Sequence, residues 1–143
     1  VALIALFNGV IGGIFNIFGI EGITLQFLLG KLFQPVMYLL SIPWVEAEAA
    51  GALFGEKIIL NEFVAFSHLN EYLDGMSPRT IAITTFSLCG FANLSSIAVL
   101  LGGLGVLVPE KRDLIGRFGI KAVLAGSLSN LMSAALAGLM LTF

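Results

Sequence analysis

Leu88-Cys89-Gly90-Phe91-Ala92-Asn93-Leu94-Ser95-Ser96 lies in the middle of a run that carries no charged residue, from Thr80 to Pro109. This run of about 30 residues is longer than the roughly 20 that cross a bilayer as a helix. A lipid-facing helix has no use for Gly, Asn and two Ser at its centre, because each unpartnered polar atom there costs on the order of a few kcal/mol. We therefore expect residues 80–108 to form a broken transmembrane helix, with an unwound centre at 90–96 that leaves backbone groups free for a ligand.

The same stretch has a second interpretation in which no ligand is held. Gly90 and Ser96 are small enough to let another helix approach closely, and Asn93 can form a hydrogen bond across such an interface. From the residues alone both interpretations remain open.

The composition predicts an integral membrane protein. Of the 143 residues, 58% are hydrophobic and 11% are charged, and the mean hydropathy is +1.03, far from the averages of soluble domains. The net charge of -2 gives no indication of a nucleic acid partner, and a single cysteine excludes an internal disulfide. Val1 lies inside an apolar run without a basic leader or a cleavage site, so we expect a piece of a longer protein.

Apolar runs at both ends predict transmembrane helices in an all-α fold. Residues 1–20 carry no charge and have the length of one membrane crossing. Residues 122–143 form the last expected span. Within it, small or polar residues recur every four positions, which predicts a face for close helix packing: Ala122, Gly126, Asn130, Ala134 and Gly138.

Residues 21–69 predict a re-entrant helical hairpin. Its second arm carries five ionisable groups, which would cost too much on a lipid-facing helix: Glu46, Glu48, Glu56, Lys57 and Glu62. Pro43 disfavours a helix at Ile42, so we expect the turn near residues 41–44. The alternative is one tilted span followed by an amphipathic surface helix.

Glu62 is the one carboxylate inside the apolar sequence from Ile58 to Phe66. An ionisable residue at such a place is a candidate for a functional site. The alternative is a structural glutamate that pairs with Lys57 or extends to the membrane surface.

Two polar connections suggest the orientation of the chain. Residues 109–121 hold four basic residues against two acidic ones, and a short connection of this kind is typically cytoplasmic. Residues 70–79 would then form an external loop.

Long motifs of the chain resemble one known family. They are Asn61-Glu62-Phe63-Val64-Ala65-Phe66, Cys89-Gly90-Phe91-Ala92-Asn93-Leu94-Ser95-Ser96, Leu101-Gly102-Gly103-Leu104-Gly105 and Lys121-Ala122-Val123-Leu124-Ala125-Gly126-Ser127-Leu128-Ser129-Asn130-Leu131-Met132. Together they are similar to the C-terminal region of the concentrative nucleoside transporter family, in its bacterial members. The resemblance extends through nearly all of the chain.

The resemblance implies a secondary active transporter that imports nucleosides by symport with sodium or protons. It implies an elevator-type homotrimer in the bacterial plasma membrane, with residues 1–20 similar to the family's scaffold helix. In the family, the glutamate of the Asn-Glu-Phe motif and the asparagine and second serine of the Phe-Ala-Asn-X-Ser-Ser motif bind the ribose. The phenylalanine lies near the sugar and base. These substrate-binding roles fall on Glu62, Asn93, Ser96 and Phe91.

The resemblance implies no cofactor and no metal ligand in this chain. The family's base-reading residues and sodium ligands lie in an earlier hairpin and helix that the chain does not contain. Other function classes remain as alternatives: a channel or structural subunit, or, with no nucleophile and base in a recognisable arrangement, a membrane enzyme.

Overall fold

The computed structural model describes residues 2–141, and in this range the fold is all-α, without a strand. The α-helices are α1 (Ala2–Ile17), α2 (Leu25–Leu39), α3 (Trp44–Ile59), α4 (Glu62–Leu69), α5 (Pro78–Leu88), α6 (Leu94–Leu107) and α7 (Arg112–Met140). Two 3₁₀ turns, η1 (Leu73–Gly75) and η2 (Pro109–Lys111), precede α5 and α7. The predicted all-α class is confirmed for the described residues.

Helix lengths give a modest indication of a membrane. Among the described residues, one helical stretch, Pro109–Met140, is long and apolar enough to cross a bilayer. Helices α2 and α3 would make a second crossing if the bent pair counts as one span. The re-entrant character of this pair and the crossing by residues 80–108 stay predictions.

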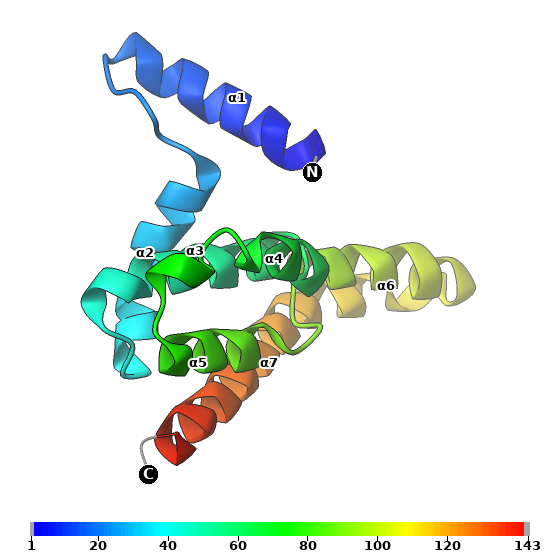
Figure 1. The fold of residues 1–143 in the computed structure, drawn as a ribbon. Coiled ribbons are helices and arrows are strands. Elements are labelled where there is room, and N and C mark those ends of the chain that lie inside the picture. Colours follow the sequence, from blue (N-terminus) through cyan, green and yellow to red (C-terminus); the bar gives the residue numbers. More distant parts are fainter. Residues whose placement is uncertain (1, 142–143) are drawn as a thin grey trace.

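The helices gather around α3, while α1 stands apart (Figure 1). Helix α3 packs against α2, α4 and α5, and α7 packs against α5 and α6. The core between them includes buried apolar side chains from several helices and from the turn between α2 and α3: Met37, Ile42, Leu53, Ile83, Leu88 and Ala134. Residues 18–24 join α1 to α2, and Asn8 of α1 accepts a hydrogen bond from the backbone N–H of Leu25 at 2.7 Å.

Two glycines let α2 and α3 come close together. A Cβ atom added at Gly51 would lie 2.8 Å from the backbone oxygen of Gly30, and one added at Gly30 would lie 2.9 Å from the backbone oxygen of Glu48. Neither oxygen belongs to a flexible side chain, so the helices themselves would have to separate. The axes of α2 and α3 bend by 118° at the turn between them.

Arg79 fixes the tip of this helix pair to the end of α7. At the tip, Ser41 adopts a positive φ of 64°, and Ile42 is buried. The Arg79 guanidinium donates from Nη1 to the Ser41 oxygen at 2.8 Å and from Nε to the Gly138 oxygen at 3.1 Å. Charge-assisted bonds of this kind are stronger than neutral ones.

The close approach of α2 and α3 predicts the effect of a single methyl group. Gly51→Ala should lower the stability of the complete protein by about 1–3 kcal/mol, because the added atom overlaps backbone. Gly102→Ala is the matched control, since a Cβ at Gly102 meets nothing within 4 Å. Thermal unfolding in detergent measures both. Equal midpoints for the two variants would contradict the packing described here.

The second arm of the expected hairpin is interrupted, which the sequence analysis did not anticipate. Helix α3 ends at Ile59, and α4 begins at Glu62 after the non-helical residues Leu60 and Asn61. The Asn61 side chain accepts a hydrogen bond from the backbone N–H of Val64 at 3.0 Å, so it caps α4. Residues 21–69 therefore contain three helices instead of two.

Other helix bounds also differ from expectation. The interruption between α5 and α6 covers residues 89–93, so Ser95 and Ser96, expected in an unwound centre at 90–96, belong to the first turn of α6. The expected connection 109–121 is helical from Arg112 onward. Lysine and arginine are good helix formers, so the basic residues that indicate a cytoplasmic position do not prevent a helix. Helix α5 begins at Pro78, inside the loop expected at 70–79, and α1 ends at Ile17. Val1, Thr142 and Phe143 lie outside the described residues.

The small-residue face of the last helix packs against other helices from Gly126 to Gly138, whereas Ala122 is exposed. A Cβ at Gly138 would lie 2.7 Å from the Ile83 side chain of α5, and one at Gly126 would lie 2.9 Å from the Cβ of Ala92. This face of α7 therefore contacts both α5 and the interruption that follows it.

Candidate functional site

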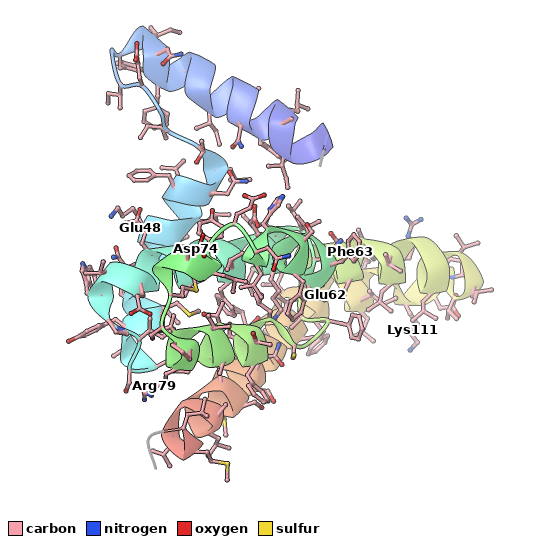
Figure 2. The ribbon with its side chains drawn as sticks, in the orientation of Figure 1. Glu48, Glu62, Phe63, Asp74, Arg79 and Lys111 are labelled. Atoms are coloured by element: carbon pink, nitrogen blue, oxygen red, sulfur yellow. The ribbon has the colours of Figure 1, made fainter. Side chains whose placement is uncertain are left out.

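One pocket contains all four residues predicted to bind substrate. It lies between the start of α4 and the start of α6, and Glu62 and Phe63 occupy the α4 side (Figure 2). Its lining residues are Asn61, Glu62, Phe63, Phe91, Asn93, Ser95, Ser96, Val99 and Leu100. Two helix interruptions, distant in sequence, thus meet at one place.

Both helices that begin at the pocket carry an asparagine cap. Asn61 caps α4, and Asn93 caps α6 by accepting from the Ser96 backbone N–H at 2.8 Å. The N-terminus of a helix carries a partial positive charge. Glu62, in the first turn of α4, places its carboxylate at such an end, where a negative charge is favoured.

Direct hydrogen bonds connect the two interruptions. Asn93 donates from Nδ2 to Glu62 Oε2 at 3.1 Å. The Ser96 hydroxyl lies 2.8 Å from the Phe91 oxygen and 2.9 Å from Asn93 Oδ1, and its one proton serves one of them at a time. A carboxylate has about four acceptor positions, so the bond from Asn93 leaves Glu62 able to accept from a ligand.

The pocket combines a buried polar group with exposed rings. Asn93 is only 2% exposed, whereas Phe91 is 79% and Phe63 is 78% exposed. A ligand could therefore hydrogen-bond to Glu62 and contact an aromatic face at the same time. Their role as substrate ligands stays a prediction.

Several features of the pocket were not predicted from the sequence. Asn61, Phe63 and Ser95 line the pocket without having been assigned to it, and the cap at Asn61 was missed. An available signal was the asparagine directly before Glu62, since asparagine is a preferred residue for the start of a helix. The suggested structural pairing of Lys57 with Glu62 gives no ion pair within 4 Å among the described residues.

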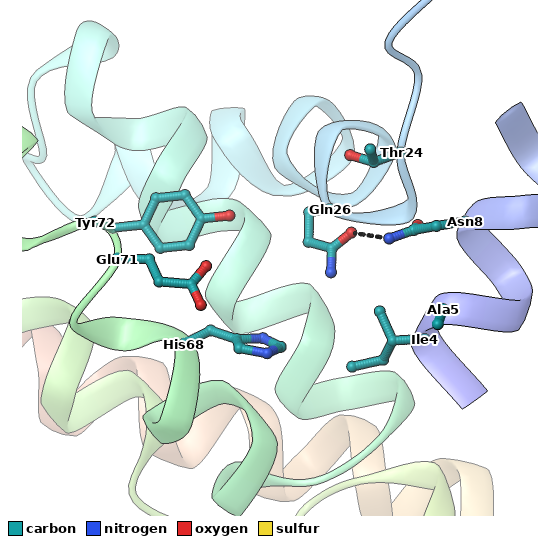
Figure 3. A pocket seen from close by; sticks show the side chains of 8 residues that line it. All are labelled: Ile4, Ala5, Asn8, Thr24, Gln26, His68, Glu71 and Tyr72. Carbon is teal, nitrogen blue, oxygen red and sulfur yellow. Dashed lines mark hydrogen bonds between the residues drawn. The ribbon is translucent and has the colours of Figure 1, made fainter. Parts of the chain in front are cut away.

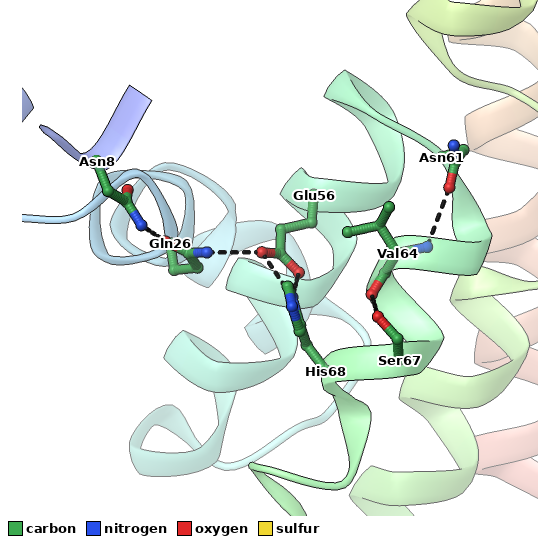
Figure 4. A network of polar contacts seen from close by, with 7 residues as sticks. All are labelled: Asn8, Gln26, Glu56, Asn61, Val64, Ser67 and His68. Carbon is green, nitrogen blue, oxygen red and sulfur yellow. Dashed lines mark hydrogen bonds and ion pairs between the residues drawn. The ribbon is translucent and has the colours of Figure 1, made fainter. Parts of the chain in front are cut away.

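A second polar network connects α1 to the other helices. In Figure 4, Asn8 donates to Gln26 at 3.1 Å, and Gln26 donates to Glu56 Oε1 at 2.9 Å. His68 Nδ1 lies 2.9 Å from Glu56 Oε2. Glu56 is only 1% exposed, so its carboxylate depends on these partners. His68 lies in the last turn of α4, within the residues 21–69 that were expected to form the hairpin.

A pocket opens beside this network (Figure 3). Polar and apolar residues from α1, α2, α4 and the segment after α4 line it: Ile4, Ala5, Asn8, Thr24, Gln26, His68, Glu71 and Tyr72. Burial raises the pKa of the Tyr72 phenol, and the negative charges of Glu56 and Glu71 raise it further. The phenol therefore stays neutral near neutral pH and can donate a hydrogen bond there.

The buried Glu56 carboxylate gives a prediction about stability. His68→Ala removes one of its two side-chain partners and should lower stability by about 1–3 kcal/mol, the usual cost of leaving a buried polar group unsatisfied. Ser67→Ala is the control, because that exposed hydroxyl donates only to the Val64 oxygen. Thermal midpoints of the complete protein in detergent compare the two. A His68→Ala midpoint equal to that of the control would show that the pair is energetically unimportant.

Comparison with known proteins identifies the family. A family model described as "Na+ dependent nucleoside transporter C-terminus" matches residues 1–138. The uncharacterized transporter YutK of Bacillus subtilis (strain 168) is 52% identical over 97% of this chain and 34% of its own length. The nucleoside permease NupC of Helicobacter pylori (strain ATCC 700392 / 26695) is 51% identical, again over 97% of this chain and 34% of its own length.

A solved structure gives the same result. CNTnw in an inward-facing substrate-bound state is 54% identical, with a TM-score of 0.88, over 96% of this chain and 34% of that protein. The chain thus spans about a third of the length of these relatives.

Fold and sequence together define a member of a transporter family, and membership implies a location in a membrane. The chain belongs to the concentrative nucleoside transporter family, of which it represents the C-terminal region. The resemblance noted from the motifs is confirmed.

Proposed function

We propose that the complete protein imports nucleosides by symport with sodium or protons, and that this chain supplies the ribose-binding part of the site. On this proposal the protein is an elevator-type homotrimer in the bacterial plasma membrane, with the coupling-ion ligands outside this chain. The name of one relative, a nucleoside permease from Helicobacter pylori, supports the substrate class. The family description "Na+ dependent nucleoside transporter C-terminus" supports the substrate class and sodium coupling.

The observation that carries the proposal is the hydrogen bond from Asn93 to Glu62 within a single pocket. It brings together a carboxylate and an amide from helices far apart in sequence. An ionised carboxylate can accept hydrogen bonds from two neighbouring hydroxyls, which a ribose offers at its 2′ and 3′ positions. The pocket chemistry therefore suits a vicinal diol.

Removing the charge of Glu62 tests its contact with the sugar. Glu62→Gln keeps the shape but loses charge-assisted hydrogen bonds worth about 1.5–3 kcal/mol. Uridine affinity of the complete protein should fall roughly ten- to a hundredfold, at about 1.4 kcal/mol per decade. Glu48→Gln is the control, because Glu48 pairs with the exposed Lys31 away from this pocket. Unchanged uridine binding by folded Glu62→Gln protein, in an equilibrium assay, would leave Glu62 a structural residue.

Asn93 needs a substitution that spares its capping role. Asn93→Ser keeps a capping oxygen for α6 but removes the amide that donates to Glu62. Uridine binding should weaken by about 1–3 kcal/mol, and deoxyribose analogues should lose less, since deletions on both sides of one contact are not additive.

The control for a lost cap is Thr24→Ala, which removes the cap of α2 away from the pocket. It should leave the ranking of uridine and its deoxyribose analogues unchanged in the same binding assay. Equal losses for every analogue in Asn93→Ser would mean that Asn93 supports packing instead of touching the sugar.

A further inference from the structure

Lys57 is a fully buried lysine that the proposed chemistry does not use. It lies in the last turn of α3, two positions before the helix ends at Ile59, and its relative exposure is 0%. Removing an ammonium group from water costs several kcal/mol unless other groups compensate. Its Nζ atom lies 5.5 Å from the centre of the Phe54 ring, which offers a weak cation–π contact. Stronger partners come from other helices.

Asn130 of α7 is the direct partner of Lys57. With its amide oriented to satisfy both neighbours, Asn130 accepts from Lys57 Nζ at 2.9 Å and donates to the Cys89 oxygen at 3.0 Å. Cys89 is the C-terminal cap of α5, where the helix leaves carbonyl groups without helical partners. A single amide thus connects the buried cation to the end of the interrupted helix.

The next residue packs directly on the same amide. Gly90 has a φ of 148°, and a Cβ atom there would lie 2.9 Å from Cγ of the Asn130 amide. The path of residues 89–93, which ends at the pocket residues Phe91 and Asn93, is therefore set by Asn130. Lys57 in turn fixes the Asn130 side chain.

Lys57 and the pocket carboxylate Glu62 belong to helices α3 and α4, on either side of the interruption at Leu60 and Asn61. The end of α3 carries a partial negative charge near the Lys57 cation.

We propose that Lys57 is a positioning residue for the ribose site. It holds residues 89–93 in place through Asn130, so that Asn93 stays beside Glu62 and both face the same ligand. The inference rests on the proposed ribose-binding function of this pocket. A lysine that only fills the core would support all ligands equally, whereas a positioning residue acts on the groups that contact hydroxyls.

The test is Lys57→Met in the complete protein, which keeps an unbranched apolar stem and removes the charge and its hydrogen bond. Displacement of labelled uridine gives the affinities for uridine and for 2′,3′-dideoxyuridine, which lacks both hydroxyls. The parent should prefer uridine by at least roughly a hundredfold, because dideoxyuridine loses two charge-assisted hydrogen bonds and each corresponds to roughly tenfold or more. Lys57→Met should bind uridine about tenfold more weakly and dideoxyuridine nearly unchanged, so the preference shrinks.

Lys31→Met is the matched control. Lys31 lies on α2 and pairs with Glu48 at a half-exposed position outside the pocket, so its loss should leave the preference at the parent value. Asn130→Leu is the second variant, because it removes the bridge to Cys89 while keeping Lys57. It should also reduce the preference for uridine, and it decides the question if Lys57→Met does not fold.

The outcomes separate the two proposals. A parent protein without any preference for uridine overturns the ribose site itself. A parent that prefers uridine, with the full preference retained in folded Lys57→Met or, failing that variant, in Asn130→Leu, overturns the positioning role alone. Equal weakening of both ligands also overturns it, because that is the behaviour of a core lysine.

Discussion

The structure depends on how two interrupted helices satisfy the backbone groups at their ends. A helix that stops and restarts within an apolar environment leaves N–H groups that need partners. Asn61 and Asn93 supply them at the starts of α4 and α6. Asn93 has a second function, because its amide nitrogen donates to Glu62. The same side chain therefore starts a helix and joins the two interruptions, and the pocket results from this coincidence.

The end of α3 is fixed by polar contacts on two sides. Glu56 and Lys57 are adjacent in sequence, so their side chains leave the helix about 100° apart. Glu56 contacts Gln26 of α2 and His68 of α4, whereas Lys57 contacts Asn130 of α7. Two opposite charges buried side by side thus bind three different helices to α3. An apolar pair at these positions would lose the hydrogen bonds that join α3 to these particular helices.

The sequence predicted one interruption and missed the other for a physical reason. Around Asn93, glycine and serine residues weaken the helix inside a charge-free run. That composition is unusual for a helix that faces lipid. Before Asn61 the chain reads Ile58-Ile59-Leu60, without glycine or proline, and local propensity gives no cause to stop. The local signal that is present, Asn61 as the cap of α4, marks where the helix restarts but not where α3 ends.

The candidate site was likewise predicted only in part from the sequence. Glu62, Phe91, Asn93 and Ser96 carried enough chemistry, together with a long motif, to be proposed as one group. The burial of Lys57 could not be predicted, since charge alone favours exposure and its partner Asn130 lies more than 70 residues further on.

The distribution of polarity in the pocket limits what this chain can recognise. Its polar side chains are concentrated near Glu62, Asn93 and Ser96, while Val99 and Leu100 make the neighbouring wall apolar. A nucleoside presents hydroxyls on the sugar and separate donors and acceptors on the base edge. Glu62 with Asn93 suits hydroxyls, and the exposed rings of Phe91 and Phe63 suit a base face, which every nucleobase shares. The proposed function therefore assigns the sugar to Glu62 and Asn93, and discrimination between bases to polar groups other than these two.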